Sequence, residues 1–180
     1  MTSIPNNMKA IQTAYGGCLF RSRLEARWAI YFDAIGWRWN YEPEGFELPS
    51  GVKYLPDFWF PAFNLYAEIK HDGAPSSAFN KARGFGGCGF PILLLDGPPD
   101  RRAYPLCDPT NNGGDITVSV SLMPARMKYA PLFYGQTFAL GEFSHYDQPT
   151  LVACALANGA RFEFGDAPVQ SRIFGTQSGC

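Results

Sequence analysis

The chain has 180 residues, enough for one compact domain with additions, because domains commonly hold about 100 to 150 residues. Hydrophobic residues make up 46% of the chain and charged residues 17%, which excludes an intrinsically disordered protein. The formal net charge of −1 gives no global attraction to nucleic acid, so any such contact must rest on local basic clusters.

A helix and a strand are predicted after the first 18 residues. Ser22 and Glu25 have the spacing of a capping box, and apolar residues then recur at helical intervals as far as Gly36, a natural stop. The apolar positions are Leu24, Trp28, Tyr31, Phe32 and Ile35. Alternating aromatic and polar residues over 37–42 then predict a half-buried strand.

Two further strands are predicted next. A turn at 49–51 precedes a strand over 53–60, in which Pro56 indicates an edge position or a bulge. Residues 65–70 form a third short strand.

A break at 72–77 caps a short helix over about 78–83. The continuous apolar run 91–95 is typical of a strand covered on both faces. Because a helical crossover joins these two strands, we expect 65–70 and 91–95 to be parallel neighbours or nearly so.

The C-terminal half has a different composition. Residues 97–114 are rich in Pro, Gly, Asp and Asn, which predicts a long surface loop. Alternation over 116–122 predicts a half-buried strand. An aspartate cap and a glycine stop predict a helix over 147–158, followed by a strand at 161–164.

The element order in residues 19–96 is αβββαβ, which predicts an α/β fold. Residues 1–18 would form an N-terminal arm. Residues 97–180 would form a C-terminal α+β extension packed on this core.

Four charged residues form the candidate site: Glu25, Asp57, Glu68 and Lys70. Because strand residues alternate in direction, Glu68 and Lys70 project from one face and Ile69 from the other. The separation from Asp57 to Glu68 is 68 − 57 = 11 positions, which suits two neighbouring strands joined by a brief turn. Two carboxylates and one ammonium can therefore converge on one point.

Such a point suits a hard divalent cation together with a phosphate, which predicts metal-dependent phosphodiester hydrolysis. We expect Asp57 and Glu68 to bind Mg²⁺, with the backbone carbonyl of Ile69 as a third ligand. Lys70 would position the attacking water or stabilise developing charge. Glu25 would bind the metal through water or support a second ion, although the capping box explains this glutamate equally well.

The alternative for the other three residues is a surface aspartate and an exposed Glu/Lys pair on a strand. Basic residues that could contact DNA occur near the two predicted helices. They are Arg21, Arg23 and Arg27, then Lys81 and Arg83, with a further pair at Arg101 and Arg102. Each of them, taken singly, is also explained as a solvated charge.

The motifs at 20–25, 41–42, 54–58 and 66–70 together resemble the PD-(D/E)xK nuclease superfamily. The amino-acid sequences of these motifs are similar to those of phage junction-resolving endonucleases and of transposase-associated endonuclease subunits. The resemblance covers about residues 19–96. It implies a restriction-endonuclease-like core with a central mixed four-stranded sheet flanked by helices, Mg²⁺ or Mn²⁺ dependence, and DNA as substrate. Branched DNA is the first expectation on this basis.

Two symmetric cuts in a junction would need two active sites, which favours a homodimer if junctions are the target. Two other functions stay open: a non-catalytic DNA-binding module on a nuclease scaffold, and a phage-encoded module that binds a protein partner.

The cysteines and the apolar runs bear on the compartment. The five cysteines are widely spaced without a Cys-x-x-Cys pair, so we expect neither a structural zinc site nor a disulfide framework. No run approaches the ~18 apolar residues of a membrane span. We expect no membrane association and a location in the cytoplasm of a bacterium or a phage-infected host cell.

Overall fold

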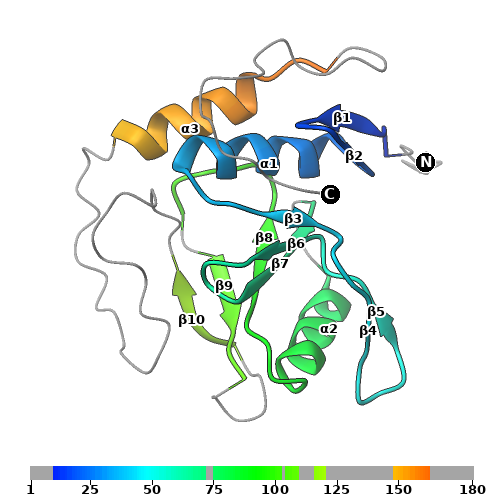
Figure 1. The fold of residues 1–180 in the computed structure, drawn as a ribbon. Coiled ribbons are helices and arrows are strands. Elements are labelled where there is room, and N and C mark those ends of the chain that lie inside the picture. The colour runs from blue at the N-terminus through cyan, green and yellow to red at the C-terminus, as the bar shows by residue number, and fades with distance from the viewer. Residues whose placement is uncertain (1–9, 72–74, 103, 110–115, 121–147, 163–180) are drawn as a thin grey trace, which may run out of the picture.

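The computed structural model describes residues 10–71, 75–102, 104–109, 116–120 and 148–162. Six strands form the central sheet, and their bounds are β3 (Asn40–Tyr41), β6 (Phe58–Phe60), β7 (Leu65–Lys70), β8 (Ile92–Asp96), β9 (Tyr104–Cys107) and β10 (Ile116–Val120). The spatial order is β10-β9-β8-β7-β6-β3. β7 and β8 are parallel, whereas the other neighbours are antiparallel. The fold is therefore α/β with a mixed sheet flanked by helices, as predicted (Figure 1).

Helix α1 (Arg23–Ile35) begins and ends where the sequence predicts. The Ser22 hydroxyl accepts a hydrogen bond from the Glu25 N–H at 3.2 Å, which is the N-cap contact. Gly36 closes the helix at φ 78°, a left-handed conformation that glycine adopts without strain. Inside the helix, Trp28 donates through its indole nitrogen to the Gly97 carbonyl at 3.0 Å, which ties α1 to the end of β8.

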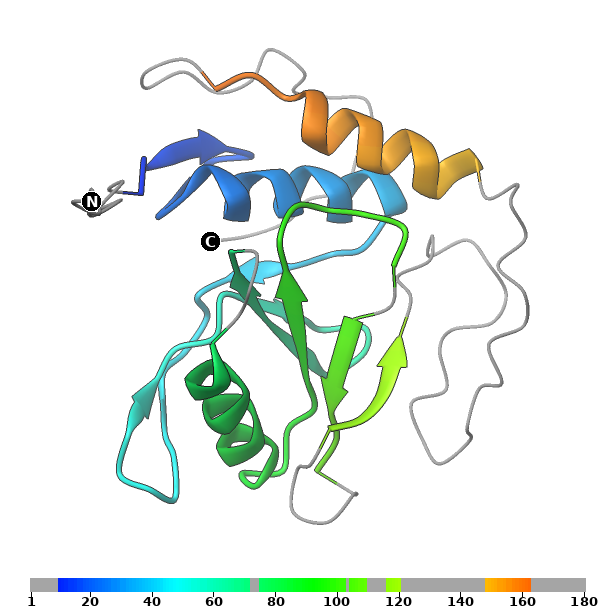
Figure 2. The same ribbon diagram turned by 180° about the vertical axis from the view of Figure 1, so that it is seen from behind.

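The helices cover opposite faces of the sheet. α1 and α3 (Gln148–Gly159) lie side by side on one face, and α2 (Ser76–Gly86) lies on the other (Figures 1 and 2). Aromatic and aliphatic side chains of α1 and the sheet fill the first interface, with Trp28, Phe32 and Phe58 fully buried. A second cluster around Tyr66 and Phe85 fills the interface with α2.

Two small hairpins flank the sheet. One joins β1 (Thr13–Tyr15) to β2 (Cys18–Phe20), and the other joins β4 (Phe46–Glu47) to β5 (Lys53–Tyr54). The second hairpin packs beside α2, where Phe46 and Phe85 have ring centroids 4.8 Å apart (Figure 2). This hairpin brings Tyr54 to the sheet.

Several predicted elements differ in extent. The predicted strand at 53–60 is two strands, β5 and β6, because the chain leaves one sheet and enters another at Leu55 to Asp57. The strand over 37–42 shortens to β3. Residues 161–162 are not in a strand, and 163–164 lie outside the described residues.

The predicted loop at 97–114 contains β9, which was missed. Its Tyr104, Leu106 and Cys107 are buried and its partners are β8 and β10. The central sheet thus has six strands where four were predicted, and two of them come from the C-terminal region. Among the described residues, no helix combines the length and apolar character needed to cross a membrane.

Candidate active site

Strand register brings the two predicted metal-binding carboxylates together. β6 pairs with β7 so that Phe58 faces Ala67. Continuing this register by one residue places Asp57 opposite Glu68. On the other side of β6, the Glu42 N–H donates to the Asp57 carbonyl at 2.9 Å, which continues the β3–β6 ladder. Asp57 therefore lies between Glu42 and Glu68 at the end of the sheet.

The strand β7 separates charged and apolar side chains as its alternation predicts. Ile69 is buried in the cluster beneath α1, whereas Glu68 and Lys70 point to the opposite face. Glu68 is only 7% exposed, and Lys70 is half-buried with its ammonium on the Glu68 carboxylate. Both residues thus sit at the boundary between the sheet interior and solvent.

Asp57 is held at both carboxylate oxygens. Oδ1 accepts from Nη2 of Arg21 at 2.8 Å, and Oδ2 accepts from the backbone N–H of Ile69 at 2.7 Å. Burial raises the pKa of Asp57 well above its ordinary value, and repulsion by the Glu68 carboxylate raises it further. The ionised form of this aspartate is thus unfavourable without additional positive charge.

Glu68 is oriented by Tyr54, a residue to which the sequence analysis assigned no role. The Tyr54 hydroxyl donates to Oε2 of Glu68 at 3.0 Å in a buried contact. Burial, and then the charge of Glu68, raise the pKa of Tyr54, so this hydroxyl stays a donor. The sequence contains a signal for it in the motif 54–58, where Tyr54 precedes Pro56-Asp57 by two residues.

Arg21 joins Asp57 to a further carboxylate that was not assigned a role, Glu42. One guanidinium nitrogen lies 2.8 Å from Oδ1 of Asp57 and 2.5 Å from Oε1 of Glu42. The Arg21 side chain is 54% exposed, so it can leave this position without opening the core. Glu42 has φ 45°, in the left-handed region where a side chain costs about 1–2 kcal/mol.

Glu25 lies next to this group but has its own partners. The Ser22 hydroxyl donates to Oε1 at 2.7 Å, while the Tyr41 hydroxyl and the Arg21 N–H donate to Oε2 at 2.5 and 3.1 Å. Arg21 therefore links the two carboxylates, with its backbone on Glu25 and its guanidinium on Asp57. The structure brings Asp57, Glu68 and Lys70 together and places Glu25 behind Arg21.

The five candidate DNA contacts have different environments. Arg23 and Arg27 are half-buried, and Arg23 donates to the Phe162 carbonyl at 3.2 Å, which connects α1 to the segment after α3. Arg21 is exposed but ion-paired. Lys81 and Arg83 are exposed on α2, the helix on the same face of the sheet as Lys70.

The donor set fits a hard cation held partly by substrate and water. In the described part of the chain, no three His, Cys, Asp or Glu side chains lie together as a ready metal site. Mg²⁺ commonly uses one or two carboxylates and keeps several waters, so Asp57 and Glu68 suffice. The N–H and C=O of one strand residue face the same neighbouring strand, so the Ile69 carbonyl is directed to the Asp57 side.

Arg21 marks the position at which positive charge is favourable, because its guanidinium rests on Oδ1 of Asp57.

Comparisons with protein-family models, with curated proteins and with solved structures find no match for this chain. The function is therefore inferred from the geometry and chemistry of these side chains.

Proposed function

We propose that the protein is a metal-dependent endonuclease that hydrolyses DNA phosphodiester bonds, with branched DNA as its first candidate substrate. The observation that carries this proposal is the meeting of Asp57, Glu68 and Lys70 at one end of the sheet, where Asp57 and Glu68 come from adjacent strands. The αβββαβ order around this end supports a restriction-endonuclease-like core.

The residues divide the work of hydrolysis among them. Asp57 and Glu68 would hold Mg²⁺ or Mn²⁺ through one oxygen each, beside the Ile69 carbonyl. When bound, the ion supplies a water of lowered pKa and neutralises charge on a phosphate oxygen. Lys70 donates hydrogen bonds and positive charge to the water or to the phosphate. Tyr54 keeps Glu68 oriented by its hydroxyl.

Arg21 has two carboxylate partners, which suggests how the site accepts a cation. Displacement from Oδ1 of Asp57 leaves the guanidinium on Glu42, at 2.5 Å in the present arrangement. A guanidinium is well suited to bind a phosphate in two places. Arg21 would therefore shift from Asp57 toward the DNA backbone when a metal binds.

A second candidate function is a DNA-binding module without catalysis. It is favoured by one observation: both oxygens of Asp57 and both oxygens of Glu68 already accept hydrogen bonds from protein donors. A cluster that is satisfied in this way can be retained for structure alone. The two functions differ in whether the bound DNA is cut.

The test incubates the purified protein with supercoiled plasmid and with a labelled four-way junction, in Mg²⁺, in Mn²⁺ or with a chelator. The variant Lys70→Ala removes the ammonium at the site. The matched control is Lys53→Ala, an exposed lysine of β5 that faces Glu47 across the small hairpin. DNA binding by both variants is measured by anisotropy in the chelator.

We expect cleavage only with added metal, and a loss of about 10²-fold or more in Lys70→Ala while Lys53→Ala keeps the wild-type rate. Cleavage that continues in the chelator or in Lys70→Ala contradicts the proposed mechanism. Binding by the wild-type protein without any cleavage selects the non-catalytic module.

A further inference from the structure

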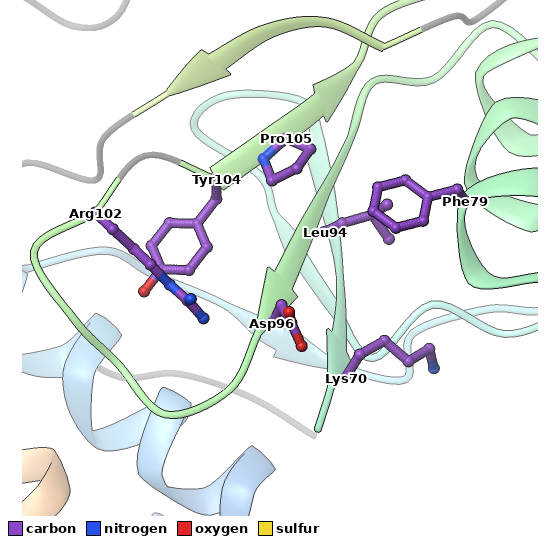
Figure 3. A pocket seen from close by; sticks show the side chains of 7 residues that line it. All are labelled: Lys70, Phe79, Leu94, Asp96, Arg102, Tyr104 and Pro105. Atoms are coloured by element: carbon purple, nitrogen blue, oxygen red, sulfur yellow. The ribbon is translucent and has the colours of Figure 1, made fainter. Parts of the chain in front are cut away.

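A cavity of about 120 Å³ opens beside Lys70, between the sheet and α2. It extends from the end of β7 across β8 to the start of β9 (Figure 3). The residues that line it are Lys70, Phe79, Leu94, Asp96, Arg102, Tyr104 and Pro105. Lys70 therefore belongs both to the candidate active site and to this cavity.

Strand register fixes the relation between the two. β7 and β8 are parallel with Lys70 aligned to Asp96 and Glu68 aligned to Leu94. Because aligned residues of neighbouring strands share a face, Asp96 and Leu94 continue the row of side chains that begins with Glu68 and Lys70. A ligand in the cavity would adjoin whatever Lys70 holds at the active site.

The lining combines three kinds of chemistry. Leu94, Pro105 and the ring of Phe79 offer apolar surface. The guanidinium of Arg102, on an exposed residue, lies 5.3 Å from the centre of the Tyr104 ring, so positive charge is held at the rim. Asp96 contributes a half-buried carboxylate, which is a hydrogen-bond acceptor.

The Asp96 carboxylate limits the choice of ligand. An ionised carboxylate only accepts hydrogen bonds, so a ligand beside it should donate one, which gives a charge-assisted contact. A phosphate alone has no donor when ionised and would be repelled by Asp96. An apolar ligand alone would offer no donor to this carboxylate, and would not use Lys70 or Arg102.

The cavity volume sets the size of the ligand. An apolar cavity of about 150 Å³ in another protein admits benzene, so a cavity of about 120 Å³ open to solvent has room for one six-membered ring inside. This matches a pyrimidine base. Between the pyrimidines of DNA, cytosine carries an amino donor at N4, whereas thymine presents the acceptor O4 in that position.

We propose that this cavity binds one unpaired cytosine nucleotide of the DNA substrate, next to the phosphate that the active site cuts. Asp96 accepts from the cytosine amino group, Phe79 and Pro105 contact the base, and Lys70 and Arg102 bind the flanking phosphates. This inference rests on the proposed function for its substrate class, and gives that substrate an unpaired base beside the cut.

The test measures binding without cleavage. Short labelled oligonucleotides of deoxycytidine and of thymidine are titrated with protein in a chelator, and affinity is read by fluorescence anisotropy. The variant is Asp96→Ala. The matched control is Asp100→Ala, an exposed aspartate outside the cavity, which removes the same charge. Thermal unfolding verifies that both variants fold.

We expect the wild-type protein and Asp100→Ala to bind the deoxycytidine oligonucleotide about tenfold more tightly than the thymidine oligonucleotide, because a hydrogen bond to a charged group is gained. Asp96→Ala should bind the two equally. A wild-type protein without this preference overturns the inference, as does a preference that persists in Asp96→Ala. Preference without metal-dependent plasmid cleavage would instead keep the inference and refute the nuclease.

Discussion

The contact between Tyr54 and Glu68 offers a direct test of the site's construction. Tyr54→Phe removes one oxygen atom and leaves the ring in its aromatic cluster, where it packs against Phe85 with ring centroids 5.4 Å apart. Oε2 of Glu68 then loses its donor at 3.0 Å, while Oε1 keeps the Lys70 ammonium. The perturbation is therefore the loss of one buried, charge-assisted hydrogen bond.

The size of the effect follows from burial. Tyr54 is 6% exposed and Glu68 is 7% exposed, so water does not readily replace the lost donor. Hydrogen bonds to charged groups contribute about 1.5–3 kcal/mol. We therefore expect Tyr54→Phe to lower the free energy of unfolding by about 2 kcal/mol, and the melting temperature by about 4–8 °C for a chain of this length.

A matched control exists in the same aromatic cluster. Tyr66 also donates its hydroxyl to a glutamate at 3.0 Å, but that glutamate, Glu44, is exposed. Water can solvate Glu44 after Tyr66→Phe, so the cost should stay below about 1 kcal/mol. Both free energies of unfolding are measured by urea denaturation at pH 7, followed by tryptophan fluorescence.

The variants Tyr54→Phe and Tyr66→Phe also distinguish an effect on stability from an effect on metal binding. Mutating a residue that hydrogen-bonds to a metal ligand typically lowers metal affinity by about 10–100-fold. The Tyr54→Phe variant should therefore need more Mg²⁺ for half-maximal cleavage, whereas the Tyr66→Phe variant should not. Equal losses of stability in the two variants would refute the burial argument. An unchanged Mg²⁺ requirement in Tyr54→Phe would refute Glu68 as a ligand.

Two further predictions concern Asp57 and the helix cap. Because burial and then Glu68 raise the pKa of Asp57 above 3.8, its folded form holds the proton more tightly. Its contribution to stability is full below pH 3.8 and is lost as the pH rises through the folded pKa. The Asp57→Asn variant should therefore unfold at higher urea than the wild type at pH 7, and at the same urea concentration near pH 3.5, when no metal is present. A difference in stability that stays constant across this pH range would contradict the raised pKa of Asp57. Ser22→Ala should cost about 1–2 kcal/mol, because the hydroxyl caps α1 and donates to Glu25; a loss below about 0.5 kcal/mol by thermal unfolding would show that the cap contributes little.

The sequence predicted the elements whose signals are local. The capping box at Ser22 and the glycine at 36 define α1 to within a residue, and the alternation in 65–70 places Glu68 and Lys70 on one face. The apolar run 91–95 and its crossover predicted the parallel pair β7–β8. These patterns depend on hydrogen bonding and side-chain direction within a few residues, so they need no tertiary information.

Three of the missed features depend on contacts between residues far apart in the sequence. β9 lies in a segment rich in Pro and Gly, and it becomes a strand because β8 and β10 pair with it. Tyr54 reaches Glu68 only because β4 and β5 form a separate hairpin beside the sheet. Glu42 becomes a partner of Arg21 through the β3–β6 ladder.

The balance of charge connects these features to the proposed activity. The cluster holds four carboxylates, those of Glu25, Glu42, Asp57 and Glu68. The side chains of Arg21 and Lys70 form ion pairs with the last three, whereas Glu25 accepts a hydrogen bond from the backbone N–H of Arg21. Fully ionised, the cluster would carry two excess negative charges. Burial raises the pKa of Asp57, and repulsion by the neighbouring Glu68 carboxylate raises it further. Stability alone favours replacing such a cluster with apolar residues. A divalent cation would neutralise the excess, so the composition of the cluster favours a cation site over a purely structural network.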